Sequence, residues 1–182
     1  MAQPHHLDPW DESSRARPEP FATGYAKGAG EGIVYGGAAV AVGALVFALV
    51  GYPVALGVAL VAGALAAWFY PTVTREPQVG ARDDGLFVDG IGFLDWSAVS
   101  ALTLHSTAVR SIMLTKLVIQ LNTDMDKAVA KPQRQPFWRS LMMRNWRLKK
   151  DAEGHPTVVV DLHTLRMPPE QILSRLRQFR SV

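Results

Sequence analysis

The feature that most constrains this chain is a long stretch without any charged residue near its N-terminus. Between Glu31 and Arg75 the sequence contains no Asp, Glu, Lys or Arg, and it reads as two apolar segments, residues 33–50 and 54–70, separated by the letters GYP. A helix that crosses a bilayer needs roughly 20 mainly apolar residues, with about 17 as the lower limit. A helix in the core of a water-soluble protein keeps a polar face, and neither segment has one. We therefore expect a transmembrane helical hairpin over residues 32–70, with a buried hairpin of a soluble protein as the alternative.

The midpoint and the two ends of this stretch favour a hairpin over one long helix. Gly51 and Pro53 disfavour a continuous helix at the midpoint. Aromatic residues gather at the outer ends, with Tyr35 on the first segment and residues 68–70, WFY, on the second. In a hairpin both of these ends meet the same membrane interface, where Trp and Tyr are enriched.

Small residues recur at helical spacing in both segments. Residues four apart lie on one face of a helix, and small side chains on that face let a second helix approach closely. The small residues of the second segment are Ala55, Ala59, Gly63 and Ala67, and their candidate partners on the first are Gly36, Ala39 and Gly43. The stripe on the second segment is therefore a candidate helix-packing face, although small residues that merely fill a short helix explain it equally well.

Basic residues beside the hairpin predict its orientation. The tip between the two segments carries no Lys or Arg, whereas Lys27, Arg75 and Arg82 flank the open ends. The positive-inside rule places such flanks in the cytoplasm. We expect a multi-pass protein with both termini cytoplasmic.

The segments outside the hairpin differ in character. Residues 1–31 combine Pro, Gly, Ser and mixed charge without apolar periodicity, which predicts a polar, disordered N-terminal tail. Residues 71–182 instead predict a cytoplasmic domain, in which short apolar or alternating runs are separated by turn signals such as Asp89-Gly90. The expected strands cover residues 85–90, 91–96, 99–107, 112–123 and 155–165.

The end of the chain predicts an amphipathic helix. Pro168 and Pro169 suit its first turn, and apolar residues follow at helical spacing. These residues are Ile172, Leu173, Leu176 and Phe179. The expected fold class is therefore α+β, with a helical hairpin, several antiparallel strands and one terminal helix.

This order of elements, with "GIGFLDWSAVSALTL" inside it, resembles the bacterial pleckstrin-homology-like (PH-like) domains. In that family a strand typically ends in a Trp followed three residues later by a small aliphatic residue, here Trp96 and Val99. The segment "PPEQILSRLRQF" resembles the family's closing helix, which plugs one end of a strongly bent sheet. The resemblance covers about residues 84–179, and many members follow a transmembrane hairpin. It implies a PH-like antiparallel barrel anchored in the bacterial inner membrane, and it implies a fold more than a function.

The chain departs from the family pattern by a long insertion, residues 124–156, that contains "RQPFWRSLMMRNWRLKK". In helical register an apolar arc opposes a basic arc, and Pro136 suits the helix start. That pattern is typical of an interfacial amphipathic helix, although a helix packed on its own sheet with a solvated basic face fits nearly as well. Nucleic-acid binding needs aromatic residues splayed for base stacking, whereas these share a face with Leu and Met. The candidate membrane- or partner-docking residues are Phe137, Trp138, Arg139, Leu141, Met142, Arg144, Trp146 and Arg147.

Residues that carry chemistry are scarce. The sequence has no cysteine, and the only close histidine pair, His5-His6, has no third ligand nearby. The apolar segments hold no carboxylate, Lys or Arg that could relay protons or line an ion path. We expect no enzymatic activity, no cofactor, no metal and no nucleic-acid partner.

Two functional hypotheses remain. In the first, the chain is a scaffold whose PH-like domain binds a membrane surface, with anionic headgroups as its lipid partner, or a protein close to that surface. In the second, it is an accessory or assembly subunit of a larger inner-membrane complex, for example a respiratory or photosynthetic one. Its hairpin would then pack on partner helices or on a second copy of itself.

Overall fold

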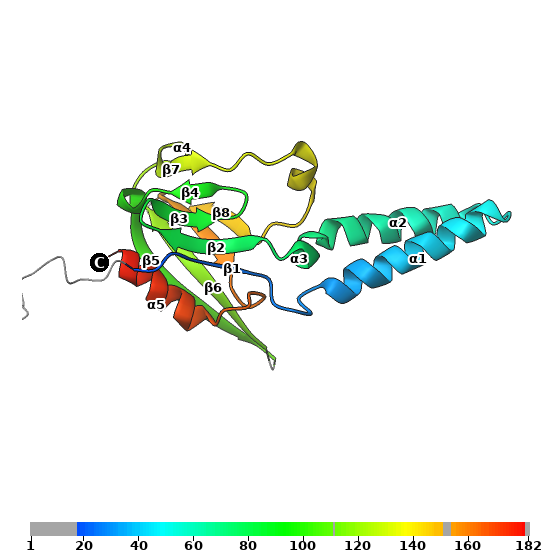
Figure 1. Ribbon diagram of the computed structural model, residues 1–182, viewed down its shortest axis with the longest axis horizontal. Coiled ribbons are helices and arrows are strands. Elements are labelled where there is room, and N and C mark those ends of the chain that lie inside the picture. The colour runs from blue at the N-terminus through cyan, green and yellow to red at the C-terminus, as the bar shows by residue number, and fades with distance from the viewer. Residues whose placement is uncertain (1–17, 111, 151–153, 181–182) are drawn as a thin grey trace, which may run out of the picture.

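The computed structural model describes residues 18–110, 112–150 and 154–180, and the structural statements below concern these residues. They form an α+β structure in which a β-rich domain carries a projecting two-helix hairpin (Figure 1). Residues 1–17, with the histidine pair His5-His6, lie outside the described part. The five helices are α1 (Glu31–Leu49), α2 (Val54–Phe69), α3 (Pro71–Thr74), α4 (Met125–Ala128) and α5 (Pro169–Phe179).

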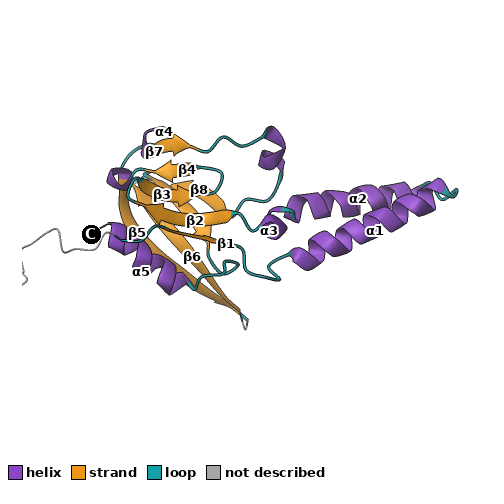
Figure 2. Cartoon of the chain, in the orientation of Figure 1, coloured by secondary structure: helices purple, strands orange, loops and turns teal. Residues whose placement is uncertain are grey.

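The strands form two antiparallel sheets (Figure 2). The first sheet has the order β1-β2-β3-β4-β7, and its strands are β1 (Phe21–Gly24), β2 (Pro77–Arg82), β3 (Gly85–Val88), β4 (Gly92–Leu94) and β7 (Val129–Pro132). The second has the order β5-β6-β9-β8, and its strands are β5 (Val99–Val109), β6 (Ile112–Leu121), β9 (Pro156–Asp161) and β8 (Trp146–Lys150). All five strands expected from the sequence are therefore confirmed, with four further strands beside them.

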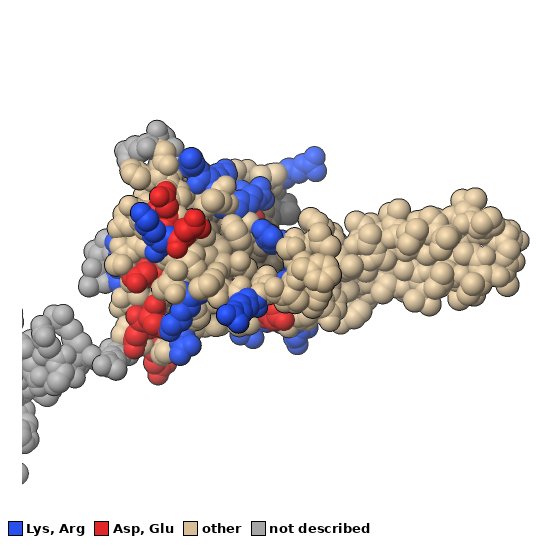
Figure 3. All heavy atoms as spheres, turned by 90° about the horizontal axis from the view of Figure 1, so that it is seen from above, with Lys and Arg blue, Asp and Glu red and all other residues tan. Residues whose placement is uncertain are grey.

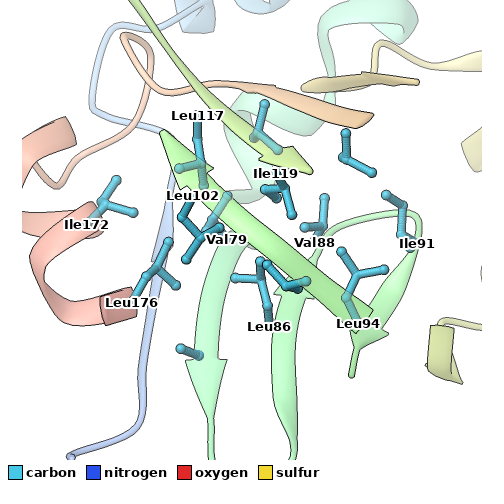
Figure 4. Close-up of a cluster of buried hydrophobic side chains, with 14 of the residues drawn as sticks. Val79, Leu86, Val88, Ile91, Leu94, Leu102, Leu117, Ile119, Ile172 and Leu176 are labelled. Carbon is cyan, nitrogen blue, oxygen red and sulfur yellow. The ribbon is translucent and has the colours of Figure 1, made fainter. Parts of the chain in front are cut away.

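The hydrophobic core lies between the two sheets and is closed on one side by α5 (Figure 4). Alternate residues of a strand point to the same face of a sheet. Leu86 of the first sheet and Leu117 of the second lie on the faces that are turned towards the core, and both are fully buried. From α5, Ile172 and Leu176 are fully buried beside them. The predicted C-terminal helix and its apolar stripe are thus confirmed.

Trp96 links α5 to the strands. It lies in the short 3₁₀ turn η2 (Trp96–Ala98) between β4 and β5. Its indole Nε1 donates a 2.8 Å hydrogen bond to the Arg82 carbonyl, and its ring stacks on Phe179 with 6.1 Å between the centroids. Val99 begins β5 and is fully buried. Both residues of the short Trp motif therefore have structural roles in the core and at the edge of α5.

Residues Phe21–Gly24 of the predicted N-terminal tail form the strand β1, which corrects the expectation of disorder there. Phe21 pairs with Ala81 of β2, and the neighbouring residue of β2, Gly80, lies against β1. A Cβ on Gly80 would lie 2.6 Å from the Phe21 carbonyl oxygen, so this pairing depends on glycine. The sequence of β2 contains Pro and Gly, which are uncommon inside strands, so the sequence alone does not predict a strand there. As a consequence, the hairpin is inserted between two adjacent strands of one sheet.

Helices α1 and α2 lie side by side and antiparallel in the hairpin (Figure 1). The helices approach closely at Gly37, where a Cβ would be 3.1 Å from the Ala62 carbonyl oxygen and 3.3 Å from the Ala66 Cβ. Further along, a Cβ on Gly63 would be 3.8 Å from that of Ala41. Small side chains on both helices therefore allow close packing.

The predicted packing stripe is only partly correct. Ala55, Ala59 and Gly63 are partly covered on the α1-facing side, whereas Ala67 is exposed and Ala66 takes its place. The predicted partners on α1 were wrong. The residues Gly36, Ala39 and Gly43 are exposed, and the covered ones are Val34, Gly37, Ala41, Ala44 and Ala48. A stripe with a strict spacing of four drifts around a helix that has about 3.6 residues per turn, so the contact face changes residues along its length.

One helix in the described part of the chain is long and apolar enough to cross a membrane. It is α1, with 19 residues and a mean hydropathy of 2.1. Helix α2 contains no charged residue but has 16 residues, fewer than the 17 of the predicted segment 54–70. Both helices expose large apolar side chains, and Figure 3 shows no Lys, Arg, Asp or Glu on the visible face of the projecting hairpin.

The predicted amphipathic helix in the insertion is wrong. Residues Phe137–Leu141 form a 3₁₀ helix, η3, and Trp146–Lys150 form β8. Asn145 ends the loop between them, since its Nδ2 donates to the Asp161 carbonyl and its carbonyl accepts from the Asp161 N–H, both at 2.9 Å. Pairing with β9 then determines the conformation of residues 146–150. The insertion also supplies β7, so it adds an edge strand to each sheet.

Candidate functional site

The base of the hairpin is fixed to the domain by short-range contacts. Arg75 Nη2 lies 2.6 Å from Glu31 Oε1, which joins the chain before α1 to the chain after α3. Thr72 is fully buried, and its hydroxyl donates a 2.8 Å hydrogen bond to the Phe69 carbonyl. Arg75 adopts a left-handed φ of 51°, which turns the chain from α3 towards β2. The two ends of the hairpin are therefore held together at its base, and only two residues lie between α3 and β2.

An exposed apolar edge lies beside this base. Phe137, Trp138 and Leu141 of η3 are 82%, 47% and 67% exposed, and we call these three residues the apolar edge. In Figure 1 the short olive helix η3 lies on the side of the domain from which the hairpin projects. The N–H of Met143 donates a 3.1 Å hydrogen bond to the Trp68 carbonyl, so the end of this loop contacts the end of α2.

A buried cationic side chain holds the same loop in place. Arg139 has a side chain that is 9% exposed, and its Nη2 lies 2.9 Å from Glu76 Oε2 and 3.3 Å from Asp89 Oδ2. The amide nitrogens of Gln133 and Gln135 donate to Asp89 Oδ1 at 3.2 and 3.0 Å. Buried charges are tolerated when they are paired and hydrogen-bonded. The cluster therefore fixes residues 133–139 against β2 and the turn after β3.

The eight predicted docking residues do not share one surface. Phe137, Trp138 and Leu141 are exposed together, whereas Arg139 is buried and Met142 is half-buried with its sulfur 4.0 Å from Arg139 Nη1.

The remaining three predicted docking residues lie at or in β8. Arg144 lies over the Trp146 ring at 5.8 Å, Trp146 packs against the core, and Arg147 Nη2 is 3.5 Å from Asp161 Oδ2. The predicted docking group of eight residues on one helix is therefore replaced by the apolar edge of three residues.

A cavity of about 350 Å³ lies where the hairpin base meets the insertion loop. From the base it is lined by Tyr70, Thr74 and Glu76, and from the loop by Gln133, Arg134, Gln135, Pro136, Trp138 and Arg139. The sequence did not predict this site, because the two groups are about sixty residues apart and meet only after the sheets form. The one signal in the sequence was the density of Arg, Gln and aromatic residues in "RQPFWR".

Groups with shifted pKa values have structural explanations. Burial, with the Asp89 carboxylate as a smaller cause, raises the pKa of Tyr25 to about 12. A hydrogen bond from Lys131 lowers the pKa of Asp84, and hydrogen bonds from the Ser97 hydroxyl and N–H lower that of Asp95. Within the described ranges, no group of three or more His, Asp or Glu side chains is arranged to hold a metal.

Comparison with known proteins gives no relative for this chain: it matches no family model, no curated protein and no solved structure. The residues of the site and their physical chemistry are therefore the basis on which a function can be proposed.

Proposed function

We propose that this chain is a non-enzymatic, multi-pass protein of the bacterial inner membrane, a scaffold whose cytoplasmic domain is held against the membrane by the hairpin. The observation that carries the proposal is the exposed, uncharged surface of α1 and α2, which projects away from the domain. Contiguous apolar surface of this kind is costly in water, whereas a hydrocarbon layer favours it, and helices satisfy their own backbone groups there.

Helix α2 is the shorter partner in this arrangement. Its 16 residues span about 24 Å, less than the roughly 30 Å of a typical hydrocarbon core. Tyr52 before α2 and Tyr70 after it supply interfacial aromatics at both ends. Local thinning of the bilayer accommodates a short span at modest cost. The hairpin then places both termini and the domain on the cytoplasmic side, because Lys27 and Arg75 lie at its open end.

The arrangement of the domain supports a PH-like fold. Two antiparallel sheets enclose one core, and the C-terminal helix α5 closes it through Ile172 and Leu176. The Trp96 indole joins β2 to the end of α5. The departure from a simple PH-like domain is the hairpin itself, which lies between β1 and β2 rather than before the domain.

The apolar edge gives the domain a second contact with the membrane. Trp138 and Phe137 are suited to the headgroup region, where amphipathic aromatic side chains partition. Lys27, Arg134 and Arg144 are exposed, and an anionic leaflet attracts such residues at about 1 kcal/mol each when they lie close to its surface. In Figure 3 most visible acidic residues lie at the end of the domain away from the hairpin, while basic residues extend up to its base.

Single cysteines test the membrane topology directly, because the natural chain has none. We expect a membrane-impermeant maleimide to label Tyr52→Cys, at the 65% exposed hairpin tip, from the outer side of intact spheroplasts. Ser174→Cys, on the exposed face of α5, is the matched control and should react only after lysis. Labelling of the α5 cysteine in intact spheroplasts would overturn the orientation, and recovery of the chain in the soluble fraction would overturn the anchor.

A second candidate function, an accessory subunit of a membrane complex, is favoured by the outer surface of the hairpin. A Cβ added to Gly36, Gly43 or Gly57 would meet no atom within 4 Å, so these faces are open and smooth enough for a further helix. Extraction in a mild detergent followed by size-exclusion chromatography should then recover the chain with other membrane proteins. Elution as a lone chain or a homo-oligomer would count against this function and leave the scaffold proposal in place.

A further inference from the structure

We propose that the cavity at the hairpin base binds one zwitterionic phospholipid headgroup, of the phosphoethanolamine type. The inference rests on the proposed function, since it requires the hairpin to lie in a bilayer. It goes beyond that function by assigning a specific site and a headgroup chemistry to a surface otherwise described only as membrane-facing.

The position of the cavity suits a headgroup. The cavity is lined by Tyr70, the last residue before α3, and by Trp138 of the apolar edge. Both residues are about half exposed, at 45% and 47%, and both types concentrate at the depth of the headgroups. The cavity volume of about 350 Å³ falls in the range of small-ligand sites, roughly 300–1,000 Å³. A lipid whose tails lie beside α2 would therefore present its headgroup at this opening.

The site is built around a buried charge rather than formed from mobile surface side chains. Arg139 lines the cavity with a side chain that is 9% exposed, and it is held by Glu76 and Asp89. Gln133 and Gln135 also line the cavity, and their amides are held by Asp89. The wall is therefore ordered before a ligand arrives, which lowers the entropic cost of binding.

The charged residues at the cavity favour a ligand that has one positively and one negatively charged group. Arg139 and Glu76 line the cavity, and Asp89 pairs with Arg139 without being a lining residue. The three together carry one net negative charge, because one cation faces two carboxylates. Arg134 adds one positive charge, and no carboxylate in the described part of the chain lies within 4 Å of it. The sum is zero, and the two charges come from different residues of the wall.

A phosphoethanolamine headgroup matches this arrangement group by group. Its phosphate accepts charge-assisted hydrogen bonds from the Arg134 guanidinium, which is the geometry that Arg favours for phosphate. The Tyr70 hydroxyl and the Trp138 indole N–H are further donors on the same wall. Its ammonium pairs with Glu76, which is 54% exposed and whose Oε2 already holds Arg139, so that Oε1 remains for the ligand. A headgroup with negative charge alone would meet Glu76 unfavourably.

Native mass spectrometry of the full-length, delipidated chain in detergent tests the proposal. The probes are dioleoyl phosphatidylethanolamine, phosphatidylglycerol and phosphatidylcholine, each titrated alone and in pairwise competition. We expect one phosphatidylethanolamine per chain, bound about tenfold more tightly than phosphatidylglycerol, which corresponds to one favourable ion contact. Phosphatidylcholine should bind more weakly than phosphatidylethanolamine, because its ammonium has no N–H to donate to Glu76.

Two variants separate the roles of the wall. Arg134→Gln should weaken phosphatidylethanolamine and phosphatidylglycerol alike, by roughly tenfold, because both lose the phosphate contact. Glu76→Gln should remove the preference between the two lipids, and this ratio remains informative even if the loop is loosened by the loss of the Arg139 pair. Arg177→Gln, on the exposed face of α5, is the matched control and should change neither lipid.

Phosphatidylglycerol bound as tightly as phosphatidylethanolamine by the natural chain would overturn the headgroup assignment. So would an Arg134→Gln chain that behaves like Arg177→Gln. Either result in a chain that spans the membrane leaves the scaffold proposal standing, whereas a chain that fails the cysteine topology test overturns both.

Discussion

The hairpin and the β-rich domain are two regions of one chain that follow opposite rules for apolar side chains. In the domain, Leu117 and Leu176 are fully buried between sheets and helix. In the hairpin, Leu60 and Leu49 are 66% and 80% exposed although the helices pack closely. The covered residues of α1 and α2 are mainly glycine and alanine, with Val34 among them, and most large side chains are exposed. The difference is the one expected if the two regions are folded for different solvents, with the hairpin in hydrocarbon, as proposed, and the domain in water.

Helix α5 shows the contrast at the level of a single element. It has one apolar face towards the core and arginines such as Arg175 and Arg177 on the outside. Helix α1 has apolar residues all round and contains one charged residue, Glu31, at its first position. A helix that is apolar all round is either buried in protein or placed in lipid, and α1 is largely uncovered by protein.

Removing a large side chain should affect the two regions very differently. Leu117→Ala creates a cavity in the domain core and should lower its free energy of unfolding by about 2–5 kcal/mol. Leu60→Ala removes the same atoms from an exposed hairpin position and should change it by less than about 0.5 kcal/mol. Chemical denaturation in detergent, followed by circular dichroism, measures both. Equal losses would mean that the hairpin surface is covered by protein after all.

A lysine placed at equally exposed positions of the hairpin and of the domain should show whether each position faces lipid or water. Val40, in the middle of α1, and Leu148, on β8, are 52% and 51% exposed. Val40→Lys should disfavour membrane insertion by about 2.5–3.5 kcal/mol, the cost of Lys at the centre of a span. Leu148→Lys should leave both insertion and folding nearly unchanged. The measurement is the fraction of chain retained in membranes after an alkaline wash, and identical retention would contradict a lipid-facing α1.

Leucine substitutions at two neighbouring glycines should have opposite effects on the contact between α1 and α2. Gly37→Leu places a large side chain where a Cβ alone would lie 3.1 Å from the Ala62 carbonyl oxygen. It should separate α1 from α2 at a cost of roughly 1–3 kcal/mol. Gly36→Leu is the matched control, since no atom lies within 4 Å of its Cβ position. Distances between spin labels on the two helices report the separation, and similar spectra for both variants would place the packing face elsewhere.

The sequence predicts elements whose pattern is local and misses those that depend on partners. Alternation in residues 112–123 and the stripe of α5 were sufficient to place β6 and the terminal helix, because each buries one face. β1 and β2 were not recognisable, since "FATG" and "PQVGAR" become strands only when they pair with each other and with β3. The 3.6-residue pattern in the insertion was misleading. There Trp146 and Leu148 alternate with the basic residues of β8, and the pairing of β8 with β9 determines their conformation.

The same distinction explains the candidate site. Phe137, Trp138 and Leu141 were predicted as part of a larger docking group on one amphipathic helix, and these three are exposed together in the structure. The burial of Arg139 was not recognisable from the sequence, because its partners Glu76 and Asp89 come from the residue before β2 and from the turn after β3. An arginine in a basic segment is normally solvated, so only the tertiary structure could show that this one is a buried structural residue.

The smallest effect expected at neutral pH concerns Tyr25, which is buried where β1 leads towards the hairpin. No hydrogen-bond partner for its hydroxyl exists among the described residues. Tyr25→Phe should therefore be neutral or slightly stabilising, since it removes an unpaired buried polar group. The pKa of Tyr25 is raised from 10.0 to about 12 in the folded chain. The unfolded chain therefore releases the proton first, and stability that is complete below pH 10 declines as pH rises towards 12.

Tyr25→Phe should consequently be more resistant than the natural chain to unfolding between pH 10 and 12, while the two chains unfold alike at pH 7. Denaturation curves measured across this range in detergent provide the comparison. Other groups that titrate in alkali affect both chains equally, so the difference between the curves isolates Tyr25. If the two curves stay parallel up to pH 12, the Tyr25 hydroxyl is solvated, and the packing of the domain beside the hairpin is looser than the structure has it.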